Sequence, residues 1–227
     1  MHISGVLFDG DGVVFDSEEL SVISFMKNLN TFGIDLTRPE CTRFIGCGTE
    51  IVLETLERER GLKIDYRQFV DRRDAIYEQV CFESNGPQRT QGIVRLLDWL
   101  DAHRVPYAIA SSASPAKVRF NLAQTGLLER FSVVVNGEDV KRGKPAPDIF
   151  LEAARRLDVP PQACLVLEDS LNGLRGAIAA GCIAVAIEGT HPDTDLRRLT
   201  EYVFKNPGAL CDELETHGFD RFDCGCD

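Results

Sequence analysis

The sequence predicts an α/β protein whose core is a doubly wound parallel sheet and whose chain is interrupted by an α-helical cap domain. Three observations lead to this prediction. A short apolar run near the amino terminus ends in two aspartates, a stretch of about 70 residues shows only helical periodicity, and the remaining chain alternates between helical and strand patterns.

The first predicted element is a strand from residue 3 to residue 8. Apolar residues lie on both sides of this run, which is typical of a strand buried on both faces in a parallel sheet. Gly10 and Gly12 end the pattern, so Asp9 and Asp11 follow the carboxyl end of the strand, where open parallel sheets bind ligands. An Asp-Gly-Asp-Gly turn without a functional role is the alternative explanation.

The segment from residue 17 to residue 83 has the apolar spacing of helices and no convincing strand. Asp16 or Ser17 is expected to cap its first helix, and Thr49 a later one. The periodicity is interrupted at Gly33, residues 38–39, residues 46–48 and Gly61. We therefore expect this segment to form a small helical domain.

From residue 88 onward, helices and strands alternate. The expected helices are 92–103, 115–125, 148–157 and 171–180, and the expected strands are 106–110, 131–135, 163–167 and 183–187. This alternation implies right-handed crossovers and a parallel sheet, which the first strand must join because its backbone needs hydrogen-bond partners. Residues 1–16 and 88–227 are thus predicted to form the core domain and residues 17–87 the cap, with candidate hinges near Asp16 and Gly86.

The composition is that of a soluble globular protein, with 227 residues, 44% hydrophobic content and a formal net charge of −11. The negative charge disfavours binding to nucleic acid or to an anionic membrane surface. The sequence contains no secretion signal and no run of about 18 apolar residues, so we expect a cytoplasmic protein without a membrane span. The eight cysteines are predicted to be reduced thiols; Cys224 and Cys226 could bind a metal but lack the further ligands that a structural zinc needs.

Three further polar stretches fall at strand ends or in loops on the same edge of the predicted sheet: residues 111–114, 141–145 and 168–170. With the first loop they would gather four carboxylates, those of Asp9, Asp11, Glu168 and Asp169. At an effective dielectric of about 20, two charges 4 Å apart repel by roughly 4 kcal/mol, so the cluster calls for a cation. Hard oxygen ligands favour Mg²⁺ over zinc. The alternative for Glu168 and Asp169 is helix capping, which would need only one of them.

A phosphate site is predicted beside these carboxylates. Ser111, Ser112 and the backbone N–H groups that follow lead into a helix amino terminus, which attracts anions, and Lys144 adds a positive charge. Taken alone, Ser111 would be an ordinary loop residue and Lys144 a solvated surface charge. The combination favours phosphate.

These residues resemble the four motifs of the haloacid dehalogenase superfamily of aspartate-nucleophile phosphotransferases, in particular its β-phosphoglucomutase-like branch, which has a helical cap after the first strand. Residues 8–13 (Phe-Asp-Gly-Asp-Gly-Val) resemble the first motif and Ser111 the second. Lys144-Pro145 resembles the third motif and Glu168-Asp169-Ser170 the fourth. The resemblance covers nearly the whole chain and implies a Rossmann-like core.

The resemblance implies a magnesium-dependent phosphatase that hydrolyses a small phosphorylated metabolite, with a sugar phosphate as the expected class. Asp9 would attack phosphorus to form an aspartyl-phosphate, and Asp11 would first protonate the leaving oxygen and then deprotonate the attacking water. Ser111 and Lys144 would hold the phosphate. The implied Mg²⁺ ligands are Asp9, the backbone carbonyl of Asp11, Asp169 and, directly or through water, Glu168.

Three other roles are open. A sugar-phosphate mutase would need cationic groups in the cap for a second phosphate; mutases that resemble this chain carry a histidine and an arginine at positions that here match Ser21 and Thr49, which favours transfer to water. A dehalogenase would lack the second aspartate of the first motif and would need no metal, whereas Asp11 and Asp169 are present. A binding or regulatory module would be expected to have lost part of the charged set.

Residues of the cap that face the site are expected to select the substrate. The candidates are Glu18 and Thr49, with their neighbours Glu19 and Glu50, although each could equally be a solvated helix residue. Gly10 departs from the related sequences, which commonly carry a side chain between the two acids. A slower Gly10→Leu enzyme would indicate that this glycine matters. The sequence leaves the oligomeric state open.

Overall fold

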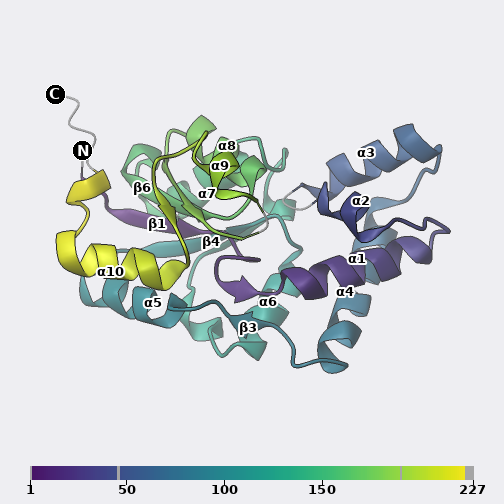
Figure 1. The fold of residues 1–227 in the computed structure, drawn as a ribbon, viewed down its shortest axis with the longest axis horizontal. Helices are drawn as coiled ribbons and strands as arrows, with labels where there is room; N and C mark the ends of the chain where they lie inside the picture. The colour runs from purple at the N-terminus through teal and green to yellow at the C-terminus, as the bar shows by residue number, and fades with distance from the viewer. Residues whose placement is uncertain (1, 45–46, 190, 223–227) are drawn as a thin grey trace.

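The computed structural model describes residues 2–44, 47–189 and 191–222. Figure 1 shows two parts, a sheet with helices on both of its faces and a helical group beside it that consists of α1 to α4. The chain enters the helical group after the first strand and returns to the sheet before α5. The predicted α/β class with inserted helices is confirmed.

A parallel sheet forms the centre of the larger part. Its strands, counted over the residues described above, number six and lie in the order β5-β4-β1-β6-β7-β8. They are β1 (Gly5–Phe8), β4 (Tyr107–Ser111), β5 (Val134–Asn136), β6 (Cys164–Glu168), β7 (Ile183–Ile187) and β8 (Val203–Phe204). Every neighbouring pair is parallel. Strand β1 therefore lies in the middle of the sheet, between β4 and β6.

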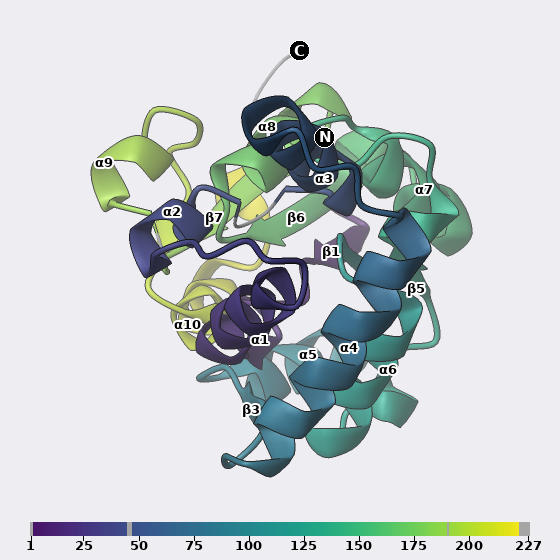
Figure 2. The same ribbon diagram turned by 90° about the vertical axis from the view of Figure 1, so that its right-hand side faces the viewer.

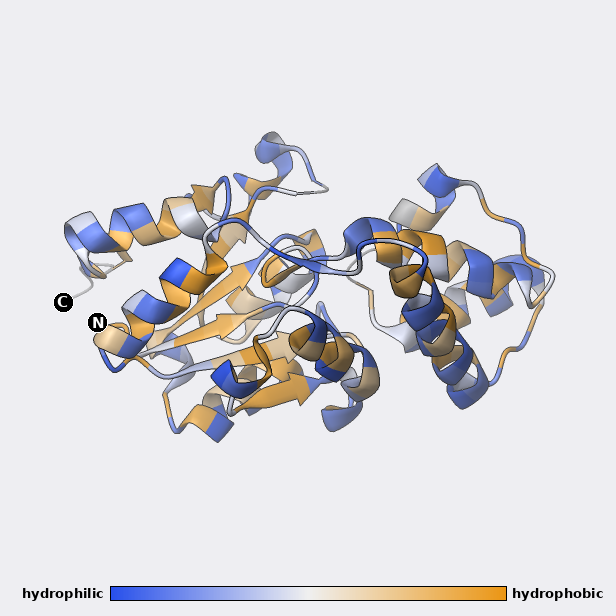
Figure 3. Cartoon of the chain, turned by 90° about the horizontal axis from the view of Figure 1, so that it is seen from below, coloured by the Kyte–Doolittle hydropathy of each residue, from blue (hydrophilic) through white to orange (hydrophobic). Residues whose placement is uncertain are grey.

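Helices bury both faces of this sheet. One face is covered by α5 (Ile93–Ala102), α6 (Pro115–Gln124) and α10 (Pro207–His217), and the other by α7 (Asp148–Leu157), α8 (Leu171–Ala179) and α9 (Asp193–Leu196). Short 3₁₀ turns occur at Leu128–Arg130, Gly137–Asp139, Pro161–Ala163 and Asp220–Phe222. Successive side chains of β1 alternate, so Val6 and Phe8 pack into one core and Leu7 into the other. Figure 3 shows the resulting apolar strands between helices of mixed hydropathy.

The helical group has an apolar core of its own. Its helices are α1 (Glu18–Asn30), α2 (Arg38–Thr42), α3 (Thr49–Arg60) and α4 (Tyr66–Phe82). Helices α1 and α4 lie side by side (Figures 1 and 2). The buried ring of Phe69 lies 6.1 Å from the ring of Phe25 and 5.9 Å from that of Phe32. A domain that folds by itself needs a hydrophobic core of this kind. The division into a cap of residues 17–87 and a core of the remaining chain stays a prediction.

The two connections between the parts pair with each other. Strands β2 (Phe15–Asp16) and β3 (Gln88–Arg89) form a short antiparallel ribbon. The ribbon lies where the hinges were expected, near Asp16 and Gly86. The pairing was not predicted because a two-residue strand leaves no periodicity in the sequence.

Two predicted boundaries differ at residues that matter for the site. Ser111 and Glu168, expected just after their strands, are the last residues of β4 and β6. Each is held by the neighbouring strand, Ser111 opposite Asn136 and Glu168 opposite Ala186. The sheet ladder therefore fixes the backbone of both residues.

Other predictions are corrected as well. Residues 38–39 open α2 instead of interrupting a helix, because proline is tolerated in the first turn. Thr49 is the first residue of α3 and Gly48 its cap, and the strand expected at 131–135 begins at Val134. Helices α9 and α10 and strand β8 were not predicted. Among the described residues, no helix is both long enough and apolar enough to cross a membrane. Cys224 and Cys226 lie outside the described residues.

Candidate active site

The carboxyl edge of the sheet collects the predicted site residues. Asp9 follows β1 directly, and because β1 lies between β4 and β6, the strands that end in Ser111 and Glu168 flank it. All three side chains are buried. Sheet topology thus brings together residues that are far apart in the sequence.

A buried lysine joins two of the carboxylates. The Nζ atom of Lys144 lies 2.5 Å from Oδ1 of Asp9 and 2.5 Å from Oε1 of Glu168. Burial alone would lower the pKa of Lys144, but the two carboxylates raise it above its ordinary value, so the lysine is charged. Only 1% of Lys144 is exposed, which rules out the solvated surface charge considered for the isolated residue. The Lys144–Pro145 peptide bond is cis.

Asp9, Glu168 and Asp169 form an acidic cluster in which one oxygen from each residue lies within 4.8 Å of the others. Burial raises the pKa of Asp9 to about 7; the charge of Lys144 opposes this rise and that of Glu168 reinforces it. Burial and the negative charges of Glu168 and Asp9 raise the pKa of Asp169 well above its ordinary value. The cluster therefore holds more negative charge than Lys144 balances, and a cation would relieve this excess.

Glu168 is held by donors from three groups. Its Oε1 accepts from Lys144, and its Oε2 accepts from the backbone N–H of Ser170 at 3.1 Å and from the Ser170 hydroxyl at 2.9 Å. The same hydroxyl oxygen accepts from the N–H of Gly173 at 3.0 Å and so caps α8. The capping role considered for Glu168 and Asp169 thus belongs to Ser170, and that alternative is wrong.

Two glycines allow the backbone to approach these acids. A Cβ atom on Gly12 would lie 2.1 Å from Oδ2 of Asp169, and one on Gly173 would lie 1.9 Å from the carboxyl carbon of Glu168. Gly12 also has a φ of +81°, a region that favours glycine. Neither position can carry a side chain while the carboxylates keep their places.

Ser111 and Ser112 lie at the predicted phosphate position. The hydroxyl oxygen of Ser111 accepts from the N–H of Ala113 at 3.2 Å. The hydroxyl of Ser112 is buried and has no hydrogen-bond partner among the described residues. A Cβ atom on Gly10 would lie 3.0 Å from Oγ of Ser111, which gives a steric reason for the missing side chain at Gly10. Ser114 caps α6, as predicted, by accepting from a backbone N–H of its first turn.

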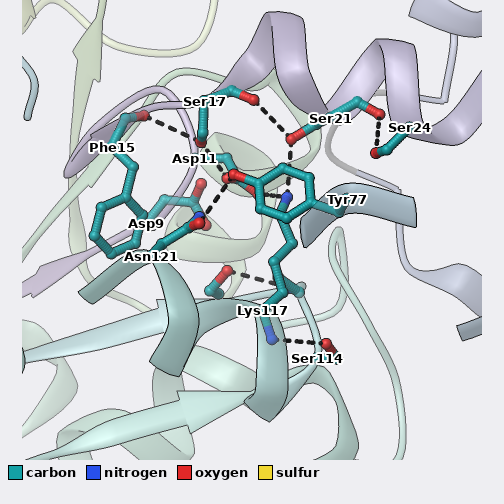
Figure 4. Close-up of polar contacts among 12 residues, drawn as sticks. Asp9, Asp11, Phe15, Ser17, Ser21, Ser24, Tyr77, Ser114, Lys117 and Asn121 are labelled. Atoms are coloured by element: carbon teal, nitrogen blue, oxygen red, sulfur yellow. Dashed lines mark hydrogen bonds and ion pairs between the residues drawn. The ribbon is translucent and has the colours of Figure 1, made fainter. Parts of the chain in front are cut away.

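The carboxylate of Asp11 pairs with a lysine that the sequence analysis missed. Nζ of Lys117 lies 2.6 Å from Oδ2 of Asp11, and the Ser17 hydroxyl donates to Oδ1 (Figure 4). Burial acts to raise the pKa of Asp11, but Lys117 and Ser17 lower it below its ordinary value, so Asp11 is ionised. Ser17 occupies the position before α1, where a capping residue was expected, but its side chain forms no capping bond and binds Asp11 instead.

Lys117 also links α6 to the helical group. Its Nζ donates to the hydroxyl of Ser21 on α1 at 2.9 Å and lies 4.6 Å from the ring centre of Tyr77 on α4. The hydroxyl of Tyr77 donates to Oδ1 of Asn121 on α6 at 2.9 Å (Figure 4). A signal for Lys117 exists in the sequence: it falls in the first turn of a predicted helix, where the helix dipole disfavours a positive charge and a carboxylate partner is therefore to be expected.

A cavity of about 160 Å³ lies between the acidic cluster and the helical group. Glu18 and Thr49, the predicted specificity residues, line it. Arg73 of α4 also lines it and was not predicted, because a basic residue inside a long helix carries no local signal of its partners. The aromatic rings of Phe25 and Phe69 are part of its apolar lining. Charged residues thus line the cavity on the side of the sheet, and mainly apolar residues line it on the side of the helical group.

A family model of haloacid dehalogenase-like hydrolases matches residues 6–187. The chain belongs to the haloacid dehalogenase-like hydrolase family. Membership confirms the resemblance found in the sequence, and the match spans the first strand, the helical group and the sheet as far as β7.

Relatives of this haloacid dehalogenase-like chain include proteins named as phosphatases. It is 31% identical over 220 residues to a bifunctional riboflavin kinase/FMN phosphatase of Arabidopsis thaliana, covering 96% of this chain and 57% of that protein. It therefore spans little more than half of that relative. It is 28% identical over 183 residues to a phosphorylated carbohydrates phosphatase of Thermotoga maritima, covering 79% of this chain and 82% of that protein.

A solved β-phosphoglucomutase structure from Clostridium difficile shares the fold. Its TM-score with this haloacid dehalogenase-like chain is 0.82, over 97% of this chain and 98% of that one, at 22% identity. At this identity the likeness concerns the fold alone. It agrees with a parallel sheet that carries a helical group after its first strand.

Proposed function

We propose that this protein is a Mg²⁺-dependent phosphatase that hydrolyses a small phosphorylated metabolite, with a sugar phosphate as the expected class. One observation carries the proposal: Asp9, at the end of the central strand, touches the buried ammonium of Lys144 and shares an acidic cluster with Glu168 and Asp169. A carboxylate nucleophile, a fixed positive charge and a cation site are the groups that phosphoryl transfer needs.

Asp9 and Asp11 divide the chemistry between them. Asp9 attacks phosphorus to form an aspartyl-phosphate while the P–O bond to the alcohol breaks, and Asp11 delivers a proton to the departing oxygen. Asp11 then takes a proton from the water that attacks the aspartyl-phosphate, which releases phosphate and restores Asp9. The Lys117 contact keeps Asp11 ionised, which suits the second step; protonation of Asp11 for the first step requires that this contact loosen.

The acidic cluster fits Mg²⁺. Its members are carboxylates, the hard oxygen ligands that Mg²⁺ prefers, and the raised pKa of Asp169 indicates uncompensated negative charge. Asp9 and Asp169 would bind the ion, with the backbone carbonyl of Asp11 as the predicted further ligand. Glu168 would act through water, because both of its oxygens already accept hydrogen bonds. When bound, the ion would offset the repulsion between Asp9 and an anionic phosphate.

Lys144 and the two serines would hold the phosphate. Lys144 presents a charge that Asp9 and Glu168 keep in place, and the unpartnered hydroxyl of Ser112 is free to donate to an oxygen of the ligand. Ser111 is the last residue of β4, the strand next to β1, and Asp9 directly follows β1. The leaving group would lie in the cavity between the acidic cluster and the helical group.

A panel of phosphorylated metabolites tests this proposal directly. With Mg²⁺, the wild-type protein should release phosphate from at least one sugar phosphate, and a chelator should abolish the release. A dehalogenase would instead need no metal, so a chelator would leave its dehalogenase activity unchanged. Interconversion of a hexose 1-phosphate and 6-phosphate without release would favour a mutase instead, and no phosphate from any compound would reject the proposal.

A further inference from the structure

The cations of the cavity are not equivalent, and the difference bears on the substrate of the proposed phosphatase. Among the described residues that line the cavity, three carry positive charge: Lys144, Lys117 and Arg73. Lys144 lies 2.5 Å from two carboxylates, and Lys117 lies 2.6 Å from Asp11. Both lysines are therefore closely paired within the protein.

Among the residues that the structure describes, no carboxylate lies as close to Arg73. Its ion-pair partner there is Asp74, the next residue on α4, at 3.4 Å. Asp74 is also engaged elsewhere, because its Oδ2 accepts from the Ser114 hydroxyl. Charge-assisted pairs are usually about 2.7–2.9 Å long, and in this protein Arg43 reaches Glu59 at 2.6 Å. Asp74 thus balances the charge of Arg73 only in part, and the remaining charge also helps to lower the pKa of Asp11. The Arg73 side chain is 18% exposed.

Thr49 fixes the direction of Arg73. NH1 of Arg73 lies 3.2 Å from the Thr49 hydroxyl, which lies at the start of α3 and also lines the cavity. Ser21 and Thr49 stand where related mutases carry a histidine and an arginine. In the structure, the Ser21 hydroxyl contacts Lys117 and the Thr49 hydroxyl contacts Arg73. A cation from another element stands at each position.

We propose that Arg73 is a specificity-determining residue that binds a second anionic group of the substrate, a carboxylate or a second phosphate, at the end remote from the phosphate being transferred. A guanidinium forms paired hydrogen bonds to either group. The apolar wall of the helical group strengthens such a contact by excluding water. The preferred substrates are therefore small phosphomonoesters with a second negative charge. This inference rests on the proposed phosphatase activity.

Matched substrate pairs test the inference without any mutation. Sorbitol 6-phosphate, 6-phosphogluconate and sorbitol 1,6-bisphosphate share a six-carbon open chain and differ at the far end in having a hydroxymethyl group, a carboxylate or a phosphate. Glycerol 1-phosphate and 3-phosphoglycerate form a shorter pair. The wild-type enzyme should prefer a charged member of at least one set by roughly tenfold or more in kcat/KM. The identity of that member distinguishes a carboxylate from a phosphate.

Variants of Arg73 assign the preference to this residue. Arg73→Met keeps the apolar stem and should raise KM for the charged substrate by roughly tenfold, with little change in kcat and little change for the uncharged member. Arg73→Lys should restore part of the preference. Arg72→Met is the matched control, because Arg72 donates to Thr31 and stacks on Phe32 instead of lining the cavity.

The outcomes separate this inference from the proposed function. Turnover of p-nitrophenyl phosphate without a preference in any substrate set would overturn the role of Arg73 and leave the phosphatase intact. Equal losses for charged and uncharged members in Arg73→Met would do the same, since they would show a structural role. Release of phosphate from no compound, p-nitrophenyl phosphate included, would reject the phosphatase and this inference with it.

Discussion

At the scale of single residues, Gly12 is constrained both by its positive φ and by the carboxylate of Asp169 beside it. Gly12→Ala would place a methyl group 2.1 Å from the Asp169 carboxylate at a positive φ. We expect it to lower kcat/KM by more than tenfold, because Asp169 must move. Gly61→Ala is the control, since Gly61 has a φ of +67° and no atom near the added methyl group; it should cost about 1–2 kcal/mol of unfolding free energy and leave the rate unchanged.

Gly10 gains a physical explanation that the sequence did not provide. A Cβ atom at this position would lie only 3.0 Å from Oγ of Ser111. Gly10→Ala should therefore slow turnover modestly, by a factor of roughly 2–10, and Gly10→Leu by more, because Ser111 must yield to the larger group. Steady-state kinetics on the best substrate of the panel measures this. Equal rates for all three proteins would show that Ser111 does not need its observed position.

The site residues that were predicted differ from those that were not in how much of their role the local sequence reveals. Asp9, Lys144 and Asp169 could be found because each sits in a short motif at a strand end or a loop, where local sequence carries the signal. Arg73 could not be found in this way, because it lies inside a long helix and its partner Thr49 belongs to another helix. Lys117 carried only the signal of a positive charge in the first turn of a helix, and its partner Asp11 comes from a distant segment. Packing between helices decides their roles.

At the scale of elements, α6 couples the sheet to the helical group through Lys117. Lys117→Met should raise the pKa of Asp11, which the lysine now lowers, so the base form of Asp11 is lost at a higher pH than in the wild type. The acidic limb of the pH–rate profile should then move up by roughly one to three units. Lys117→Arg should keep the limb near its original place. An unmoved limb in Lys117→Met would contradict the role of Asp11 as a base.

Most of the longer elements were predictable from the sequence, and the two-residue strands were not. Long helices and buried strands such as α4 and β1 follow from periodicity, whereas β2, β3 and β8 are two residues each and follow only from pairing. Helix α10 carried usable signals, Asn206 as its cap and a proline in its first turn.

At the scale of the whole molecule, the acidic cluster sets the pH dependence of stability in the metal-free protein. The pKa of Asp9 is raised to about 7 and that of Asp169 is raised as well, so the folded state binds protons that the unfolded state has lost above its ordinary pKa. Stability should therefore fall as the pH rises toward and through about 7. Urea unfolding at several pH values measures the slope of unfolding free energy against pH. The wild-type protein with a chelator should show the decrease, and the slope should be smaller in Asp169→Asn and in the wild type with Mg²⁺. Equal slopes under all three conditions would contradict a cluster that shares a cation.

The central claim is that Asp9 is the nucleophile of a phosphatase. Acid quench during turnover of phosphorus-labelled p-nitrophenyl phosphate, followed by peptide mapping, tests it most directly. We expect label on the peptide that contains Asp9, more of it in Asp11→Asn because hydrolysis is slowed, and none in Asp9→Asn. Asp35→Asn, an exposed aspartate outside the cavity, should behave as wild type. Phosphate release at the wild-type rate by a folded Asp9→Asn protein would contradict the account.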